Sequence, residues 1–179
     1  IEPLESGHLT FTDLLHSWQK FFAFFLSFFI IAVFWKIHHE FYVHIRKIDN
    51  KLLWFNIGWL LFIVMLPFSS SLVSSYLFDT AAVFTYSVNV LFVTIFQNII
   101  WDYASGKPEF LKSDVNADLI RDYRLSCNIA MANALGAAAL SFLSPILAFL
   151  FLLTRLPLFN IAARIYRLRK EKKKRGRFR

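Results

Sequence analysis

The feature that most constrains this chain is an apolar run from Phe21 to Phe34, in which Ser27 carries the only polar side chain. A helix needs about 20 apolar residues, rising about 1.5 Å each, to cross the ~30 Å hydrocarbon core of a bilayer. Taken from Trp18 to Ile37, the run is long enough to span. It ends in a basic, histidine-rich segment, which is typical of a helix leaving the bilayer on its cytoplasmic side.

Composition favours the membrane class over a single water-soluble domain. The chain is 57% hydrophobic, contains 22 Phe, and concentrates its net charge of +8 in a few clusters. A soluble domain would distribute its charges more evenly. The single cysteine, Cys127, lies in an apolar segment and is expected to be a small buried hydrophobic residue.

Apolar runs and their breaks predict an all-α membrane protein with five transmembrane helices. The predicted spans are residues 18–37, 52–66, 80–101, 125–143 and 145–159. Residues 1–17 are expected to be an extracellular linker, 18–159 a transmembrane helical domain, and 160–179 a basic cytoplasmic tail.

Residues in the connections predict where each span ends and the next begins. Pro67 is expected to close the second span, followed by a serine-rich loop to Asp79, which with Thr80 can cap the third span. The segment 38–51 is a tight turn or a helix extension, with Asp49 and Asn50 marking the next start. In the loop 102–124, residues 114–124 can form a short surface helix, and Ser144-Pro145 splits the last two spans.

The positive-inside rule gives the orientation of these spans. Lys and Arg number 4 in residues 36–51, 4 in 102–124 and 11 in 155–179, with none in the intervening connections. The alternation places residue 1 outside and the C-terminus in the cytoplasm. Because residues 1–17 do not resemble a signal peptide, a sixth helix upstream of residue 1 is expected to start in the cytoplasm.

The histidine-rich segment after the first span invites a metal-site interpretation. However, the spacing His39-Glu40-x-x-x-His44 is one residue longer than the zincin helix motif, so the two histidines point about 140° apart on a helix. No metal site is therefore predicted. Either one residue of the pair His38 and His39 hydrogen-bonds a polar residue of a neighbouring helix, or both lie at the membrane interface.

A second group of polar residues, Tyr86, Asn89 and Gln97, lies along one side of the third span, with Val93 completing the row. An amide in hydrocarbon costs several kcal/mol unless it is paired, so the row should face protein or water. It either holds helices together or lines an ion path.

Several functions are disfavoured by what the sequence lacks. It has no phosphate-binding glycine loop, no nucleophile beside a base and no paired carboxylates within a span, so we predict neither an enzyme nor a cofactor. The basic tail contains little aromatic character and follows a membrane exit. It is expected to contact anionic lipid and not nucleic acid.

One block of the sequence resembles a known family. From Phe25 to Phe68 it contains a phenylalanine-rich helix ending Phe34-Trp35-x-x-His38-His39, a basic turn, Leu52-Leu53-Trp54-x-Asn56 and Leu66-Pro67-Phe68. This block is similar to helices two and three of the bacterial branch of the transmembrane protein 175 family, the endolysosomal-type potassium channels. The family's hallmark Arg-x-x-x-Phe-Ser-Asp motif, on its pore-lining first helix, is absent, and Ile1-Glu2-Pro3-Leu4-Glu5 resembles the end of that helix.

The resemblance implies a potassium-preferring cation channel in a bacterial plasma membrane. Its subunits would form a homotetramer, with selectivity at rings of apolar side chains on the upstream helix. The resemblance also implies that Trp35, His38, His39 and Asn56 form a polar network supporting that pore helix. The competing function is a non-conducting membrane scaffold whose basic tail recruits anionic lipid or a soluble partner.

Overall fold

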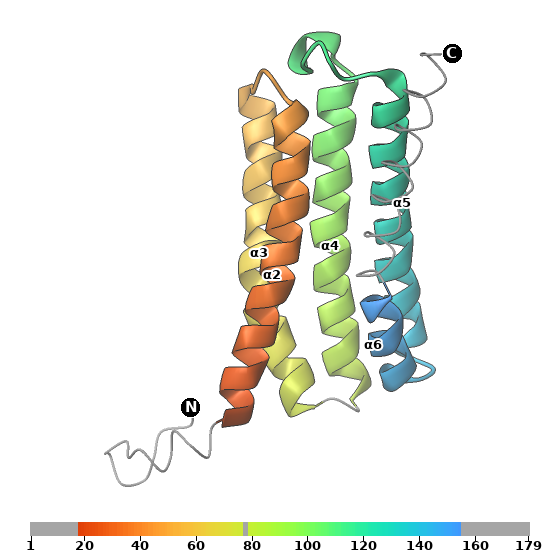
Figure 1. Ribbon diagram of the computed structural model, residues 1–179. Coiled ribbons are helices and arrows are strands. Elements are labelled where there is room, and N and C mark those ends of the chain that lie inside the picture. The colour runs from red at the N-terminus through yellow and green to blue at the C-terminus, as the bar shows by residue number, and fades with distance from the viewer. Residues whose placement is uncertain (1–17, 77–78, 155–179) are drawn as a thin grey trace, which may run out of the picture.

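A computed structural model describes residues 18–76 and 79–154, and these residues form a helical bundle. Its elements in chain order are α2 (Trp18–His44), α3 (Asn50–Ser75), α4 (Thr80–Ser105), the short 3₁₀ helix η1 (Pro108–Phe110), α5 (Ala117–Leu140) and α6 (Pro145–Leu153). The five α-helices alternate in direction along the bundle (Figure 1). The described residues contain no strand, only one isolated antiparallel bridge between Ile45 and Leu111.

The first described helix is longer than the span predicted for residues 18–37. α2 continues to His44, so the basic segment after the apolar run begins as a helix extension. The chain then turns through residues 45–48. Asp49 caps α3 by accepting a hydrogen bond from the backbone N–H of Leu52 at 2.8 Å, which confirms it as the start of the second helix.

The prediction that Pro67 closes the second span is wrong, because α3 runs through it to Ser75. A proline inside a helix removes one backbone donor, but packing and serine hydroxyls can compensate. Ser70 Oγ donates to the Pro67 carbonyl oxygen and Ser69 Oγ to that of Leu66, both at 3.1 Å. The buried face also continues beyond the proline, through Ser69 and Val73. Most of the predicted serine-rich loop is therefore helix.

The remaining helices follow the predicted order with different ends. Asp79 caps α4 through Ala81 N at 2.7 Å, as predicted. α5 begins at Ala117 under an Asn116 cap, so the predicted surface helix and the span predicted from residue 125 are one continuous element. Ser144 caps α6, and the end of the fifth predicted span, 155–159, lies outside the described residues, as do the linker 1–17 and the tail.

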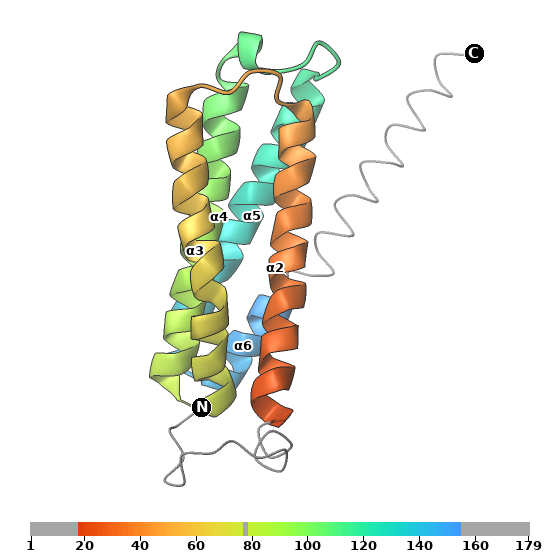
Figure 2. The same ribbon diagram turned by 90° about the vertical axis from the view of Figure 1, so that its left-hand side faces the viewer.

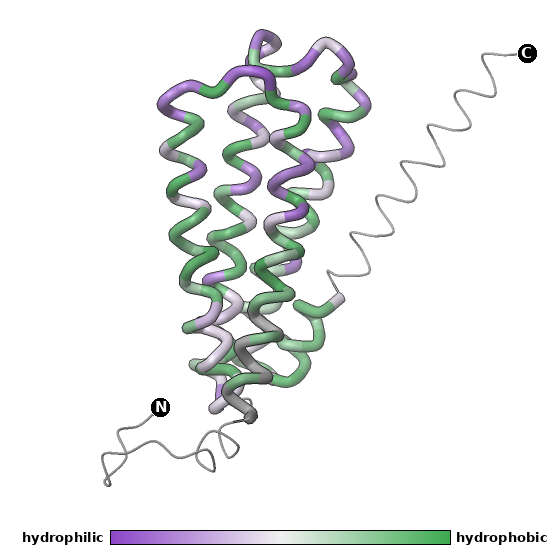
Figure 3. Tube along the Cα trace, turned by 60° about the vertical axis from the view of Figure 1, so that its left-hand side comes forward, coloured by the Kyte–Doolittle hydropathy of each residue, from purple (hydrophilic) through white to green (hydrophobic). Residues whose placement is uncertain are grey.

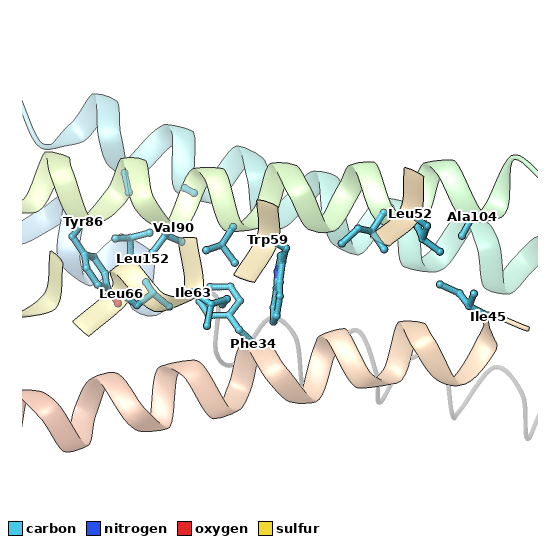
Figure 4. Packing of buried hydrophobic residues seen from close by; sticks show 14 of the residues in the cluster. Phe34, Ile45, Leu52, Trp59, Ile63, Leu66, Tyr86, Val90, Ala104 and Leu152 are labelled. Carbon is cyan, nitrogen blue, oxygen red and sulfur yellow. The ribbon is translucent and has the colours of Figure 1, made fainter. Parts of the chain in front are cut away.

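The core lies between α3 and its neighbours. Trp59, Ile63 and Leu66 point from α3 toward Phe34 of α2 on one side and the α4 residues on the other (Figure 4). Trp59 is fully buried and Phe34 is 5% exposed. Burying apolar side chains contributes about 1.5–3 kcal/mol each in water, while in lipid close packing and hydrogen bonds hold helices together.

The bundle's outer surface is apolar over most of its length. Two described helices, α3 and α4, are long and apolar enough to cross a membrane. Hydrophilic residues gather at the end holding the α2–α3 connection and η1, while green, hydrophobic positions dominate the remainder (Figure 3). Exposed side chains such as Val64 at 75% and Leu143 at 84% would be costly in water and are suited to lipid.

Candidate functional site

The clearest polar link between α2 and α3 is made by His38. Its Nε2 lies 2.7 Å from Oδ1 of Asn56, and the His38 side chain is buried. Since a carboxamide oxygen only accepts, Nε2 carries the proton in this arrangement. The bond therefore joins the two helices at a depth where an unpaired donor would be costly.

Aromatic rings enclose the same histidine. The His38 ring stacks on Trp59 with centroids 4.3 Å apart, on Tyr42 at 4.4 Å and on Trp35 at 5.5 Å. Such contacts fix the ring plane, and the hydrogen bond to Asn56 fixes its rotation. The imidazole is thus held in one orientation.

Three of the four residues expected in a common network therefore meet. His38 contacts both Asn56 and Trp35, although the Trp35 side chain is also 56% exposed. His39, next along α2, is on the exposed side of the helix and does not join them. Their support of a pore helix stays a prediction. Among the described residues, no group of three or more His, Cys, Asp or Glu side chains could hold a metal ion.

The polar row on α4 is buried, as expected for amides that face protein. Tyr86, Asn89 and Gln97 are each no more than 6% exposed. Asn89 Nδ2 donates to Ser69 Oγ of α3 at 3.0 Å, so this residue links helices. Within the described residues, Asn89 Oδ1 and Gln97 Nε2 have no hydrogen-bond partner.

A separate network closes the basic end of the bundle. The Tyr103 hydroxyl donates to Asp49 Oδ2 at 2.6 Å, and Lys107 Nζ donates to the Tyr103 oxygen at 2.6 Å and to Asp49 Oδ2 at 3.4 Å. The bond from Tyr103, then that from Leu52 N–H, hold the pKa of Asp49 below its usual value, with a smaller contribution from Lys107. The Tyr103 bond likewise raises the pKa of Lys107.

Sequence reasoning missed this second network. Asp49 was recognised only as a helix start, and its partner Tyr103 lies 54 residues further along the chain. The one available signal is the i, i+4 spacing of Tyr103 and Lys107 at the end of α4, which lets their side chains meet. Nothing in the sequence connects that pair to Asp49.

The fold and the comparisons with known proteins point to the same class of protein. The described residues form a helical bundle in which two helices are long and apolar enough to cross a membrane and hydrophilic positions gather at one end. The model of the family described as "endosomal/lysosomal potassium channel TMEM175" matches residues 2–67. This match confirms the resemblance to that family seen in the sequence, over about the first third of the chain.

Individual relatives are distant. A potassium channel of Chryseobacterium sp. (strain P1-3) is 25% identical over 85 residues, covering 45% of this chain and 44% of the relative. A potassium channel of Streptomyces collinus is 20% identical over 112 residues, covering 60% and 54%. The endosomal/lysosomal proton channel TMEM175 of Mus musculus is 26% identical over 126 residues, covering 70% and 25%. The chain thus spans between a quarter and about half of the length of these relatives.

Proposed function

We propose that this chain forms part of a potassium-preferring cation channel of the TMEM175 family. The observation that carries the proposal is the family match over residues 2–67, which includes the whole of α2 and most of α3. Two bacterial relatives named as potassium channels add support. The membrane-length helices α3 and α4 suit a protein that conducts ions across a bilayer.

The proposed channel is a homotetramer of subunits that each cross the membrane with five described or predicted spans and one preceding pore helix. Selectivity then arises from partial dehydration of the ion at rings of apolar side chains on the pore helix, because no carbonyl filter is invoked. We place the protein in a bacterial plasma membrane with its basic tail, residues 160–179, on anionic lipid in the cytoplasm.

Within this proposal, Trp35, His38 and Asn56 position α2 for contact with the pore helix. The bond from His38 to Asn56 holds one side of α2 against α3. The exposed surface of α2 carries His39 and a set of large apolar side chains, namely Phe21, Phe25, Phe28, Phe29 and Val33. That surface is suited to receive a further helix, where His39 would join the network.

A flux assay tests the proposal. The full-length protein is reconstituted into potassium-loaded liposomes. Potassium efflux is followed in the presence of a protonophore, which carries protons inward and so balances the charge that leaves with potassium. We expect efflux that depends on the protein. A separate arm measures proton uptake, since animal relatives are named proton channels.

The scaffold function makes the opposite prediction. It requires no flux from correctly folded protein, together with loss of binding to anionic vesicles or to a soluble partner when residues 170–179 are removed. Uptake of protons without potassium efflux would leave the protein a channel but contradict the potassium preference.

A further inference from the structure

Three lysines surround one pair of aromatic rings at the polar end of the bundle. The rings of Tyr103 and Phe110 have centroids 5.9 Å apart. Lys107 Nζ lies 4.1 Å from the Tyr103 centroid and 4.6 Å from that of Phe110, Lys51 Nζ lies 5.2 Å from Tyr103, and Lys47 Nζ lies 5.6 Å from Phe110. We call Lys47, Lys51 and Lys107 the lysine cluster.

Backbone pairing between two distant loops builds this cluster. Arg46 N donates to the Phe110 carbonyl oxygen at 2.7 Å, and Lys112 N donates to that of His44 at 3.0 Å. The α2–α3 connection and the segment around η1 accordingly lie side by side at one end of the bundle (Figure 2). The fold therefore brings the three ammonium groups to the same pair of rings, and cation–π contacts offset part of their mutual repulsion.

Within residues 18–76 and 79–154, the cluster carries positive charge that is only partly paired with carboxylates. Among the described residues, Asp49 carries the only carboxylate that forms an ion pair with the cluster, through Lys107. The two oxygens of this carboxylate already accept hydrogen bonds from Leu52 N, the Tyr103 hydroxyl and Lys107 Nζ. Lys47 and Lys51 have exposed side chains and make no side-chain hydrogen bond or ion pair within the same residues. Glu109 is exposed on the neighbouring η1 and reduces the local net charge without pairing with either lysine.

Three exposed apolar residues are close neighbours of Lys47 and Lys51 in the sequence. Ile48 is 56% exposed, Leu53 48% and Trp54 64%, and they flank Lys47 and Lys51 in the sequence. Tryptophan at this level is typical of the boundary between headgroups and acyl chains. A surface that offers both cations and exposed apolar side chains matches an anionic lipid better than a free anion, which would use only the cations.

We propose that the lysine cluster binds the phosphate of an anionic lipid headgroup, with the acyl chains against the exposed side chains of Ile48, Leu53 and Trp54. The inference rests on the membrane placement of the proposed function but not on conduction. It differs from lipid binding by the basic tail, because it assigns a site within the folded bundle. Lys47 and Lys51 supply the free donors, and Lys107, fixed by Asp49 and Tyr103, supplies a third positive charge.

Native mass spectrometry of the full-length protein tests this site. The protein in neutral detergent is titrated with phosphatidylglycerol, and the Kd of the first bound lipid is measured. A near-surface lysine contributes about a fivefold factor in binding to anionic lipid. We therefore expect Lys47→Gln/Lys51→Gln to weaken the first binding event roughly thirtyfold, while Lys47→Arg/Lys51→Arg retains it.

The matched control removes two charges from the same end of the bundle. Arg121→Gln/Arg124→Gln alters residues that already pair with Asp118 and Asp102 and should change the Kd by less than about threefold. Equal losses in both double variants would overturn the site, since they would report only net charge. Displacement of the lipid by an equimolar amount of inorganic phosphate would also overturn it, because the ligand would then be a free anion.

Discussion

His38 of α2 and Asn56 of α3 are joined by a 2.7 Å hydrogen bond between side chains 18 residues apart, inside a stack of aromatic rings. The bond fixes how the first two described helices meet. It lies in the segment that the TMEM175 family model matches, residues 2–67.

Replacing Asn56 with Ala should destabilise the bundle by about 1–3 kcal/mol, because it leaves the buried His38 donor without its partner. The measurement is unfolding in mixed micelles by denaturing detergent, followed by tryptophan fluorescence. Asn50→Ala is the matched control, since Asn50 is exposed at the start of the same helix. Equal stability of the two variants would show that the bond contributes nothing.

The Asp49 network predicts a specific response to acid. Its folded pKa is lowered from 3.8, so the folded carboxyl binds its proton less tightly than the unfolded one. The resulting stability is complete above the unfolded pKa and is lost as pH falls below about 3.8 through the folded pKa. Tyr103→Phe removes the largest cause of the shift and should move the acid transition to higher pH.

Circular dichroism between pH 7 and pH 2 measures that transition. The control is Tyr76→Phe, which makes the same change at a side chain that is 61% exposed. A transition that moves equally in both variants would mean that the Tyr103 hydroxyl does not act on Asp49.

Gly58 allows α3 and α4 to approach closely, because a Cβ there would overlap the ring of Phe96. Gly58→Ala should therefore destabilise the bundle by about 1–3 kcal/mol despite alanine's higher helix propensity. Phe96→Leu should reduce that loss in the double variant, which a double-mutant cycle in the same unfolding assay measures. Strictly additive effects would contradict the predicted overlap.

The predicted orientation can be tested with cysteines added at opposite ends of the bundle. Lys112→Cys should react with a membrane-impermeant maleimide only from the cytoplasmic side, and Leu143→Cys only from the other side. The native Cys127 is buried and should remain unlabelled under these conditions. Labelling of both added cysteines from one side would refute the alternating topology.

The helices could be predicted from the sequence better than their ends. Apolar runs locate α2, α3 and α4 because their length alone meets the requirement of a bilayer. The prediction that Pro67 ends the second helix was wrong because it considered only the local effect of proline on the backbone. The buried face of α3 continues to Val73, and the hydroxyls of Ser69 and Ser70 donate to nearby carbonyl oxygens, so the helix continues past the proline. α5 begins before the predicted residue 125 because Asn116 caps it, and a search for apolar runs does not detect such a cap.

The site could be predicted only in part. The resemblance grouped His38 with Trp35 and Asn56, but only the rotation of α2 decides that His38, and not His39, faces α3. Adjacent helix residues point about 100° apart, so a shift of one position exchanges their environments. The lysine cluster could not be predicted, because it depends on the pairing of loops around Ile45 and Leu111.

Potassium-preferring conduction can be measured as the reversal potential of the full-length protein in a planar bilayer. With potassium on one side and sodium on the other at equal concentrations, we expect a nonzero reversal potential of the sign that a higher permeability to potassium than to sodium produces. A reversal potential at zero, or one that follows the proton gradient alone, would contradict it.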